Sequence, residues 1–224
     1  MRHCIILHLY YQDLWDEFSS YIRSLLGEDV DLIVTVAESQ EVPKQVTDIA
    51  TLVIKVPNRG MDIGPFLLAY QQVRGKYKTI TKLHTKKSLH TPHIGDSWRK
   101  GLYAPLLTFY RELVANLLET EEPSMIGVNS FILQEESDPG RSTVELQAYI
   151  QTICNTLSIH GRGSFVAGSM FIVNNVYMEK YFSDENINNI YKMFPEGYIR
   201  DDSPAHAMER VFGYIATQNN FLVI

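Results

Sequence analysis

The sequence lacks a long apolar run and is poor in cysteine. A helix that spans a membrane needs about 20 consecutive apolar residues, and no run in the 224 residues approaches that length. Residues 1–11 are apolar but include two histidines and lead into an acidic amphipathic stretch, which predicts a first strand and not a signal peptide. The two cysteines, Cys4 and Cys154, form no disulfide framework, so we expect buried thiols and a cytoplasmic protein.

The sequence also lacks an excess of positive charge. Lys and Arg number 20 against 26 Asp and Glu, which gives a formal net charge of -6. This acidic balance argues against nucleic acid as a partner, although it leaves room for a local basic site. With 45% hydrophobic and 21% charged residues, the chain is not of a disordered type and can bury a core. The length favours one α/β domain over residues 1–224.

Short apolar runs alternate with segments of helical periodicity in the first half of the chain. The runs predict buried strands, and the segments between them predict helices. Strands that alternate with helices pair in parallel, so we expect an α/β fold with a mostly parallel central sheet and helices on both faces. The expected strands are 3–9, 30–36, 51–56 and 77–83, and the expected helices are 13–26, 41–48 and 63–73.

Longer elements follow in the second half. The helical region 97–119 should break near Pro105, because proline has no amide hydrogen to donate within a helix. The apolar run 165–174 is expected to form one strand, whose central glycine indicates close approach by a ligand or tight packing against a helix. Ser203 as N-cap and Pro204 at the first helical position predict the start of a final helix. Further elements are expected at 124–129 (strand), 134–141 (surface loop), 144–157 and 204–217 (helices).

Cationic side chains follow the fourth predicted strand. Strand alternation puts Lys82, His84 and Lys86 on one face, and Lys87 comes next. In parallel sheets, ligands bind beyond the carboxyl ends of the strands. The segment therefore predicts a diphosphate site in which positive side chains, without a metal, stabilise the charge that develops in the transition state. The alternative is a solvated basic loop.

Arg59 and Asp62 follow the third predicted strand. Asp62 is placed to cap the helix 63–73, whose amino end offers free backbone N–H groups. Arg59 adds a cation that can grip phosphate in a fork. Together they can hold a diphosphate or a nucleotide, and the alternative is a capped helix beside a surface arginine.

Metal-binding patterns are weak in this sequence. The Asp-x-Asp pair formed by Asp29 and Asp31 stands at the start of a strand, on the wrong edge of the sheet, and is interpreted as surface charge. His84, His90 and His93 share one loop, but their spacing matches no strong zinc pattern and a fourth ligand is missing. We therefore expect neither a metal nor another cofactor.

Two carboxylates, Asp201 and Asp202, stand just before the final helix. A carboxylate in this position could accept a proton from an acceptor hydroxyl. The alternative is that both residues only favour the helix dipole. The spacing alone does not separate a catalytic from a structural role.

Taken in order, these segments resemble the rhamnan synthesis F family over nearly the whole chain. The most specific stretches are 62–66 and 84–87. The other matching stretches are 10–11, 58–60, 82–88, 95–99, 167–171 and 205–213. The resemblance implies a GT-A-like fold and a glycosyltransferase of polysaccharide or O-antigen biosynthesis. It implies a nucleotide-sugar donor, dTDP-L-rhamnose, and a growing or lipid-linked glycan acceptor, met by peripheral contact at the inner membrane face.

The resemblance also implies roles for the residues that match. An inverting transfer needs one carboxylate base, for which Asp201 is the first choice. The other carboxylates that could serve are Asp202, Glu209 and Asp62. The diphosphate would be held by Arg59, His84 and Lys86, the nucleotide or sugar by Asp62, and the nucleobase or ribose by Thr35 and Glu38, with His8 and Tyr10 lining the same cleft. The rival hypotheses are a non-catalytic nucleotide- or glycan-binding domain and a nucleotide-sugar hydrolase.

Overall fold

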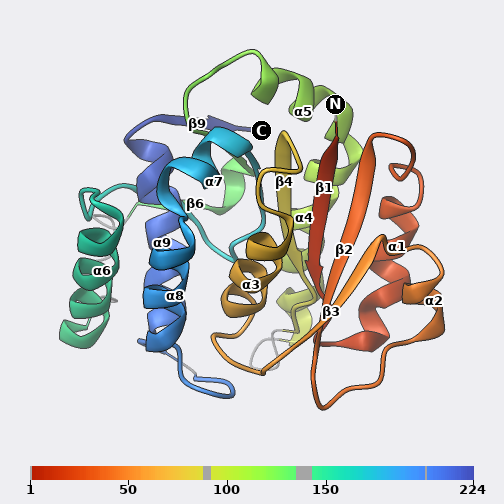
Figure 1. Ribbon diagram of the computed structural model, residues 1–224, viewed down its shortest axis with the longest axis horizontal. Coiled ribbons are helices and arrows are strands. Elements are labelled where there is room, and N and C mark those ends of the chain that lie inside the picture. The colour runs from red at the N-terminus through yellow and green to blue at the C-terminus, as the bar shows by residue number, and fades with distance from the viewer. Residues whose placement is uncertain (1, 88–91, 135–142, 200) are drawn as a thin grey trace.

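The computed structural model describes residues 2–87, 92–134, 143–199 and 201–224, with the backbone alone for 92–94. Its main feature is a seven-stranded sheet in the order β3-β2-β1-β4-β8-β5-β9 (Figure 1). A separate two-stranded sheet pairs β6 with β7. The strands are β1 (His3–His8), β2 (Val30–Ala37), β3 (Leu52–Val56), β4 (Thr79–His84), β5 (Ser124–Gly127), β6 (Ile132–Gln134), β7 (Ser164–Val166), β8 (Phe171–Asn174) and β9 (Asn220–Val223).

Most strands of the large sheet run parallel. β1 pairs in parallel with both β2 and β4, and β2 pairs in parallel with β3. β8 runs antiparallel between β4 and β5, and β9 pairs in parallel with β5. The predicted α/β fold with a mostly parallel sheet is therefore confirmed, with β8 as the antiparallel strand.

Helices cover both faces of the sheet (Figure 1). α3, α8 and α9 pack together on one face, and α1, α4 and α5 lie on the other. Parallel strands covered on both faces are buried throughout, and β1, β2 and β4 are buried at every position. The helices are α1 (Trp15–Ile22), α2 (Lys44–Thr47), α3 (Ile63–Val73), α4 (Pro92–Thr108), α5 (Tyr110–Leu118), α6 (Val144–Leu157), α7 (Asn175–Tyr181), α8 (Asp184–Met193) and α9 (Pro204–Thr217), with 3-10 turns η1 (Gln12–Leu14) and η2 (Asn129–Phe131).

Aromatic packing in the core joins distant parts of the chain. The ring of Phe66 on α3 lies 6.2 Å from that of Phe171 on β8 and 5.9 Å from that of Phe212 on α9. Cys4 and Cys154 are both fully buried, as expected. These contacts fix α9 against α3, so residues from distant parts of the sequence border one region of the sheet.

The apolar run 165–174 is not one strand, which corrects the prediction. It forms β7 in the small sheet and β8 in the large sheet, joined by a tight turn over 167–170. Gly168 has φ +99 and Ser169 has φ +48, a backbone region that glycine adopts without strain. The small residues at the centre of the run therefore serve a turn between two sheets.

The break in the helical region 97–119 lies later in the sequence than predicted. α4 continues through Pro105 to Thr108, and the interruption falls at Phe109. The amide of Phe109 donates to the carbonyl of Pro105 at 3.1 Å, and the neighbouring Leu102 and Leu106 are fully buried. Packing therefore allows the helix to continue past proline, which has no amide hydrogen to donate.

The strand β9 was not expected from the sequence.

Asp31 is not a surface charge, which corrects a second prediction. Its side chain is 8% exposed and forms an ion pair with Arg2 at 2.6 Å. It also accepts hydrogen bonds from the hydroxyls of Tyr77 at 2.7 Å and Thr51 at 3.1 Å. Asp29 pairs with Arg111 at 3.2 Å. Both aspartates lie at the amino end of β2, so they fasten the edge of the sheet that is opposite the carboxyl ends of the strands.

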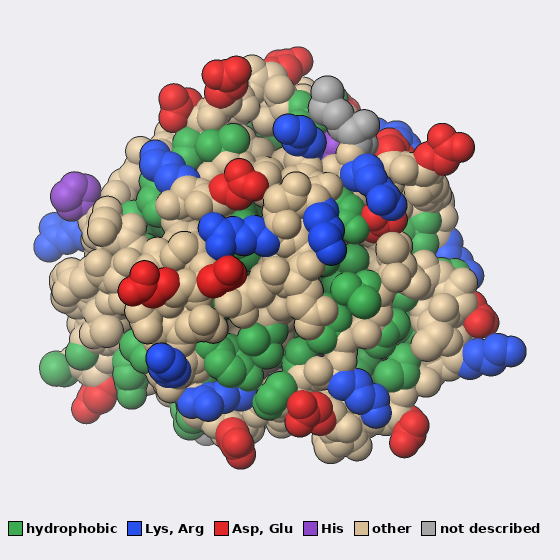
Figure 2. Space-filling model, viewed as in Figure 1, with side chains coloured by type: hydrophobic (Ala, Val, Ile, Leu, Met, Phe, Trp, Pro, Cys, Tyr) green, Lys and Arg blue, Asp and Glu red, His purple; other side chains and the backbone are tan. Residues whose placement is uncertain are grey.

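Charge is distributed rather than concentrated on the face seen in Figure 2. Lysine and arginine side chains are interspersed there with aspartate and glutamate. Within the described ranges, none of the helices combines the length and the apolar character needed to cross a bilayer.

Candidate functional site

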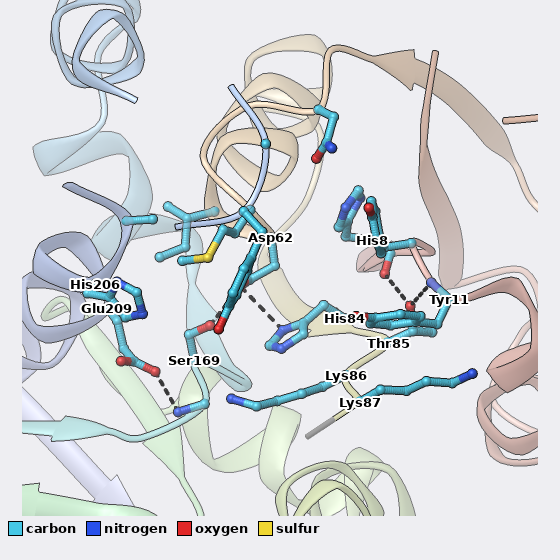
Figure 3. Close-up of a pocket in the computed structure, with 18 residues that line it drawn as sticks. His8, Tyr11, Asp62, His84, Thr85, Lys86, Lys87, Ser169, His206 and Glu209 are labelled. Carbon is cyan, nitrogen blue, oxygen red and sulfur yellow. Dashed lines mark hydrogen bonds and ion pairs between the residues drawn. The ribbon is translucent and has the colours of Figure 1, made fainter. Parts of the chain in front are cut away.

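A pocket of about 430 Å³ opens beyond the carboxyl ends of β1 and β4. This is the place where an open α/β sheet binds its ligands. Walls come from five parts of the chain: the segments after β1, β3 and β4, the turn between β7 and β8, and the region from 197 into α9. The lining residues are His8, Tyr10, Tyr11, Asn58, Met61, Asp62, Ile63, His84, Thr85, Lys86, Lys87, Gly168, Ser169, Gly197, Tyr198, Ala205, His206 and Glu209 (Figure 3).

Lys82 lies beneath this pocket and does not line it. Its side chain is 1% exposed, and its ammonium group donates to the carboxylate of Asp62 and to the carbonyl and hydroxyl oxygens of Ser169, the last two at 3.0 and 2.9 Å. These three acceptors use the three N–H donors of an ammonium group. Its position as a direct diphosphate ligand, expected from the sequence, is therefore not found.

Asp62 occupies the N-cap position of α3, but its side chain makes no capping hydrogen bond. The carboxylate turns instead toward Lys82 and accepts a hydrogen bond from the hydroxyl of Ser169 at 2.8 Å. Burial alone would raise the pKa of Asp62, but His84, Lys82 and the hydrogen bonds outweigh it and hold the pKa below its ordinary value. Asp62 is thus ionised at neutral pH and is satisfied by its neighbours.

Two of the histidines that line the pocket, His8 and His84, are neutral rather than cationic. Burial lowers the pKa of His84 to about 3, although the nearby Asp62 opposes the shift. Burial likewise lowers the pKa of His8 to about 4. Nδ1 of His84 lies 3.3 Å from Asp62, and Nδ1 of His8 lies 2.9 Å from the hydroxyl of Thr35. The ring of His8 is therefore held by its Nδ1 side, and His84 does not supply the positive charge expected from the sequence.

Lys86 and Lys87 differ in what their ammonium groups contact. Lys87 pairs with Asp13 and lies 5.2 Å from the ring centre of Tyr11. In Figure 3 the two side chains extend in opposite directions, and Lys86 points toward Ser169 and Glu209. Lys86 has no ion pair with any residue in the ranges that the structure describes. Its charge is therefore directed into the pocket.

A buried arginine fixes the backbone that carries Lys86. Arg99 donates to the carbonyl of Lys86 at 3.0 Å and forms a two-pronged contact with Glu17 at 2.8 and 2.7 Å. The hydroxyl of Tyr103 donates to the same carboxylate at 2.9 Å. Paired guanidinium and carboxylate groups of this geometry are strong and directional. They tie the segment after β4 to α1 and α4.

Glu209 faces the pocket from α9. One carboxylate oxygen accepts the backbone N–H of Gly168 at 2.6 Å, and the other lies 4.0 Å from Arg210. The helix begins where the sequence predicts, because Ser203 caps it and His206 completes a capping box. His206 and Glu209 are three residues apart and therefore share one face of the helix. Sequence reasoning ranked Glu209 below Asp201; the spacing from His206 was the available signal.

Arg59 does not line the pocket. Its guanidinium donates to the backbone carbonyls of Phe194 and, at 2.9 Å, Lys192, and lies 5.5 Å from the ring centre of Tyr191. Its backbone also forms a bridge with Glu196. Cations are stabilised at the carboxyl end of a helix, which here is the end of α8. Arg59 therefore fastens the segment after α8 to the segment after β3.

The remaining predicted residues are divided between the pocket and its surroundings. Tyr10 lines the pocket, whereas Thr35 is fully buried behind His8. Asp201, Asp202 and Glu38 are not among the lining residues. Asp202 has φ +55, which places it at a sharp bend before α9. His90 and the side chain of His93 lie outside the described residues. Among the residues that the structure describes, no group of three metal-binding side chains occurs.

The fold and the pocket define a GT-A-like α/β domain, with a ligand site at the carboxyl edge of its parallel strands. A comparison with protein families finds a match over almost the whole length. The chain belongs to the rhamnan synthesis protein F family, which it matches over residues 1–221. Neither the curated proteins nor the solved structures contain a significant match. The family has a role in the synthesis of rhamnan and related polysaccharides, with a sugar donor and a glycan acceptor.

Proposed function

We propose that the protein is a glycosyltransferase that moves L-rhamnose from dTDP-L-rhamnose to a growing cell-surface polysaccharide or a lipid-linked glycan, with inversion at the anomeric carbon. The observation that carries the proposal is the arrangement of Lys86 and Glu209 in one pocket. A cation without a protein counter-ion in the described ranges and a carboxylate, held by the N–H of Gly168 and 4.0 Å from Arg210, face the same space. The proposal extends the role in polysaccharide synthesis that the family provides.

Lys86 would hold the diphosphate of the donor. As the bond between the anomeric carbon and the diphosphate oxygen breaks, negative charge grows on the leaving group. A fixed ammonium group stabilises that charge more in the transition state than in the ground state. The ion pair of Lys82 with Asp62 supports this role, because it keeps the Asp62 charge from repelling the diphosphate.

Glu209 would act as the general base, in place of Asp201 or Asp202. The acceptor hydroxyl attacks the anomeric carbon, its proton passes to the carboxylate oxygen that does not bind Gly168, and the nucleoside diphosphate leaves from the opposite face. The hydrogen bond from Gly168 holds the carboxylate in place. This assignment is supported by the position of Glu209 in the pocket lining, which Asp201 and Asp202 do not share.

His84 would orient a hydroxyl group of the donor. The Asp62 carboxylate lies 3.3 Å from Nδ1, which favours the tautomer with the proton on that nitrogen. Nε2 then offers a lone pair rather than a positive charge. An acceptor of this kind suits a sugar or ribose hydroxyl better than a phosphate oxygen.

The test measures donor binding and turnover in the same preparation. dTDP and dTDP-L-rhamnose should raise the melting temperature in the presence of a chelator, since the site uses side chains in place of a metal. Release of dTDP from the sugar donor should then require a glycan acceptor. Release at the same rate without acceptor would identify a hydrolase, and binding without release would identify a non-catalytic domain. A requirement for manganese would contradict the metal-free site.

A lipid-linked acceptor would bring the protein to the inner membrane face as a peripheral protein. Flotation with vesicles that contain a polyprenyl-linked glycan, compared with vesicles that lack it, measures this. Equal recovery with both vesicles would argue for a soluble acceptor.

A further inference from the structure

One aromatic side chain at the pocket is largely exposed. Tyr198 lines the pocket, yet the residue is 68% exposed. Tyrosine buries most of its ring when it serves the core, as Tyr177 and Tyr214 do here. An exposed aromatic ring that borders a cavity indicates a surface for a ligand.

The segment that carries Tyr198 is fixed on the amino-terminal side of the ring. The N–H of Gly197 donates to the carbonyl of Asn58 at 2.7 Å, and the N–H of Gly60 donates to the carbonyl of Pro195 at 3.2 Å. Arg59 adds its hydrogen bonds to the carbonyls at the end of α8. The backbone under the ring is thus tied to the segment after β3. A tyrosine on a fixed backbone offers contact area with little loss of conformational entropy on binding.

Two further aromatic side chains, Tyr10 and Tyr11, line the same pocket. Burial, and next the neighbouring phenol of Tyr10, raise the pKa of Tyr11. The ring of Tyr11 stands edge-on to Tyr10 at 5.1 Å, and its backbone N–H donates to the hydroxyl of Thr85 at 2.9 Å. Three tyrosines, Tyr10, Tyr11 and Tyr198, therefore line the pocket.

The surroundings of Tyr198 favour an uncharged ligand. The charged side chain in the segment 195–199 is Glu196, an exposed carboxylate that repels phosphate. The same stretch of chain leads through Ala205 and His206 to Glu209, all of which line the pocket. The cation Lys86 comes from the separate segment after β4. A neutral group that reacts near Glu209 thus fits this side better than a nucleotide.

We propose that Tyr198 is the platform on which the acceptor glycan stacks the C–H face of a pyranose ring. The inference rests on the proposed function and names the place of its acceptor. Stacking there orients a sugar hydroxyl toward the interior of the pocket, where Glu209 accepts its proton. Tyr198 touches the acceptor but exchanges no proton or bond with it.

The test compares Tyr198→Ala and Tyr198→Phe with Phe109→Ala as a matched control. Phe109 is 54% exposed and lies outside the pocket lining. With dTDP-L-rhamnose saturating and a rhamnose trisaccharide as acceptor, Tyr198→Ala should raise the acceptor KM about tenfold, while Tyr198→Phe and Phe109→Ala stay near wild type. The dissociation constant for dTDP should stay within about twofold in all three variants.

Three results would overturn the proposal. An unchanged acceptor KM in Tyr198→Ala would show that the ring does not bind the acceptor. An equal rise of the acceptor KM in Tyr198→Phe would show that the hydroxyl group, and not stacking on the ring, makes the contact. A weaker dTDP affinity in Tyr198→Ala would assign the ring to the nucleotide. If the wild type shows no transfer, saturation-transfer NMR with the trisaccharide alone still decides, because binding that Tyr198→Ala abolishes supports the platform independently of turnover.

Discussion

Lys82 and Asp62 form a buried ion pair under the floor of the pocket, and Ser169 binds both partners. The ammonium and carboxylate groups come from β4 and from the start of α3, and the hydroxyl comes from the turn between β7 and β8. Three segments that are far apart in the sequence therefore meet at one charge pair. Burial lowers the pKa of Lys82 against the opposing effect of Asp62. The ion pair holds these three segments together beneath the pocket. Its two charges offset each other, so Lys86 supplies the positive charge that faces the pocket.

Replacing one partner of this pair should destabilise the fold. Lys82→Met leaves the Asp62 carboxylate in a largely buried place without its counter-ion, which costs about 3–5 kcal/mol. Urea unfolding measures the loss. The double variant with Lys82→Met and Asp62→Asn should recover much of the stability, because no unpaired charge remains. Equal stability of wild type and Lys82→Met would show that the pair contributes nothing.

Adjacent lysines provide a matched test of the diphosphate site. Lys86→Ala should weaken dTDP binding about tenfold or more, because a charge-assisted contact with phosphate is lost. Lys87→Ala changes the same charge but removes a lysine that pairs with Asp13. Titration calorimetry should find it close to wild type at moderate salt. Equal losses in the two variants would point to a general electrostatic effect instead.

Glu209→Gln should remove transfer while it keeps the fold and the donor site. The amide oxygen of glutamine can still accept the N–H of Gly168, but glutamine cannot take a proton from the acceptor. We expect kcat to fall about 100- to 10,000-fold, with the affinity for dTDP unchanged. Asp201→Asn is the contrast, since Asp201 does not line the pocket. A larger loss in Asp201→Asn than in Glu209→Gln would return the base to the residue expected from the sequence.

Stability should fall as the pH falls below neutral. The folded pKa values of His8, about 4, and His84, about 3, lie below the ordinary value of 6.5, so the unfolded chain binds more protons between these limits. Near pH 5 each histidine should cost on the order of 1–2 kcal/mol relative to pH 7. Asp62 adds nothing to this slope, because its lowered pKa makes its contribution disappear only below the ordinary value of 3.8.

Urea unfolding at several pH values measures the slope. His8→Gln and His84→Gln should each flatten it, whatever their effect on stability at neutral pH. A wild-type stability that does not change between neutral pH and about pH 5 would show that these rings are protonated in the folded state.

α9 packs against β7 so closely that one position accepts no side chain. A Cβ atom on Gly213 would lie 2.2 Å from the carbonyl oxygen of Ser164 and 2.3 Å from Cα of Phe165. Gly213→Ala should therefore destabilise the fold by about 1–3 kcal/mol, measured by thermal unfolding. Gly27 has open space around its Cβ position, so Gly27→Ala is the control. Similar melting temperatures for the two variants would contradict the close packing.

The fold could be predicted well from the sequence, because the residues that mark its helices and strands lie close together in the sequence. The bounds of α3 and α6 and the start of α9 were predicted to the residue, since capping residues and helical periodicity mark them within a few positions. The turn between β7 and β8 was missed, because an apolar run does not show which sheet each half joins. β9 was missed for the same reason: its partner, β5, is about a hundred residues earlier.

The site was predicted less completely, because charge type does not reveal contacts. Lys82, Lys86 and Arg59 are all cations near strand ends, yet only Lys86 extends into the pocket. Lys82 is committed to Asp62, and Arg59 to backbone carbonyls at the end of α8. Such partners come from tertiary packing. The place of the site at the carboxyl edge, in contrast, follows from topology and was predictable.

The fastening of the segment 195–199 has a consequence for divergence among related chains. The bonds that hold it at Pro195 and Gly197 use main-chain atoms, and the φ of +75 at Gly197 suits glycine. Substitutions of Tyr198 and Ile199 therefore leave the anchoring untouched. Related chains could therefore bind a different acceptor sugar through changes at Tyr198 and Ile199, while the donor site around Lys86 continued to bind the same nucleotide sugar.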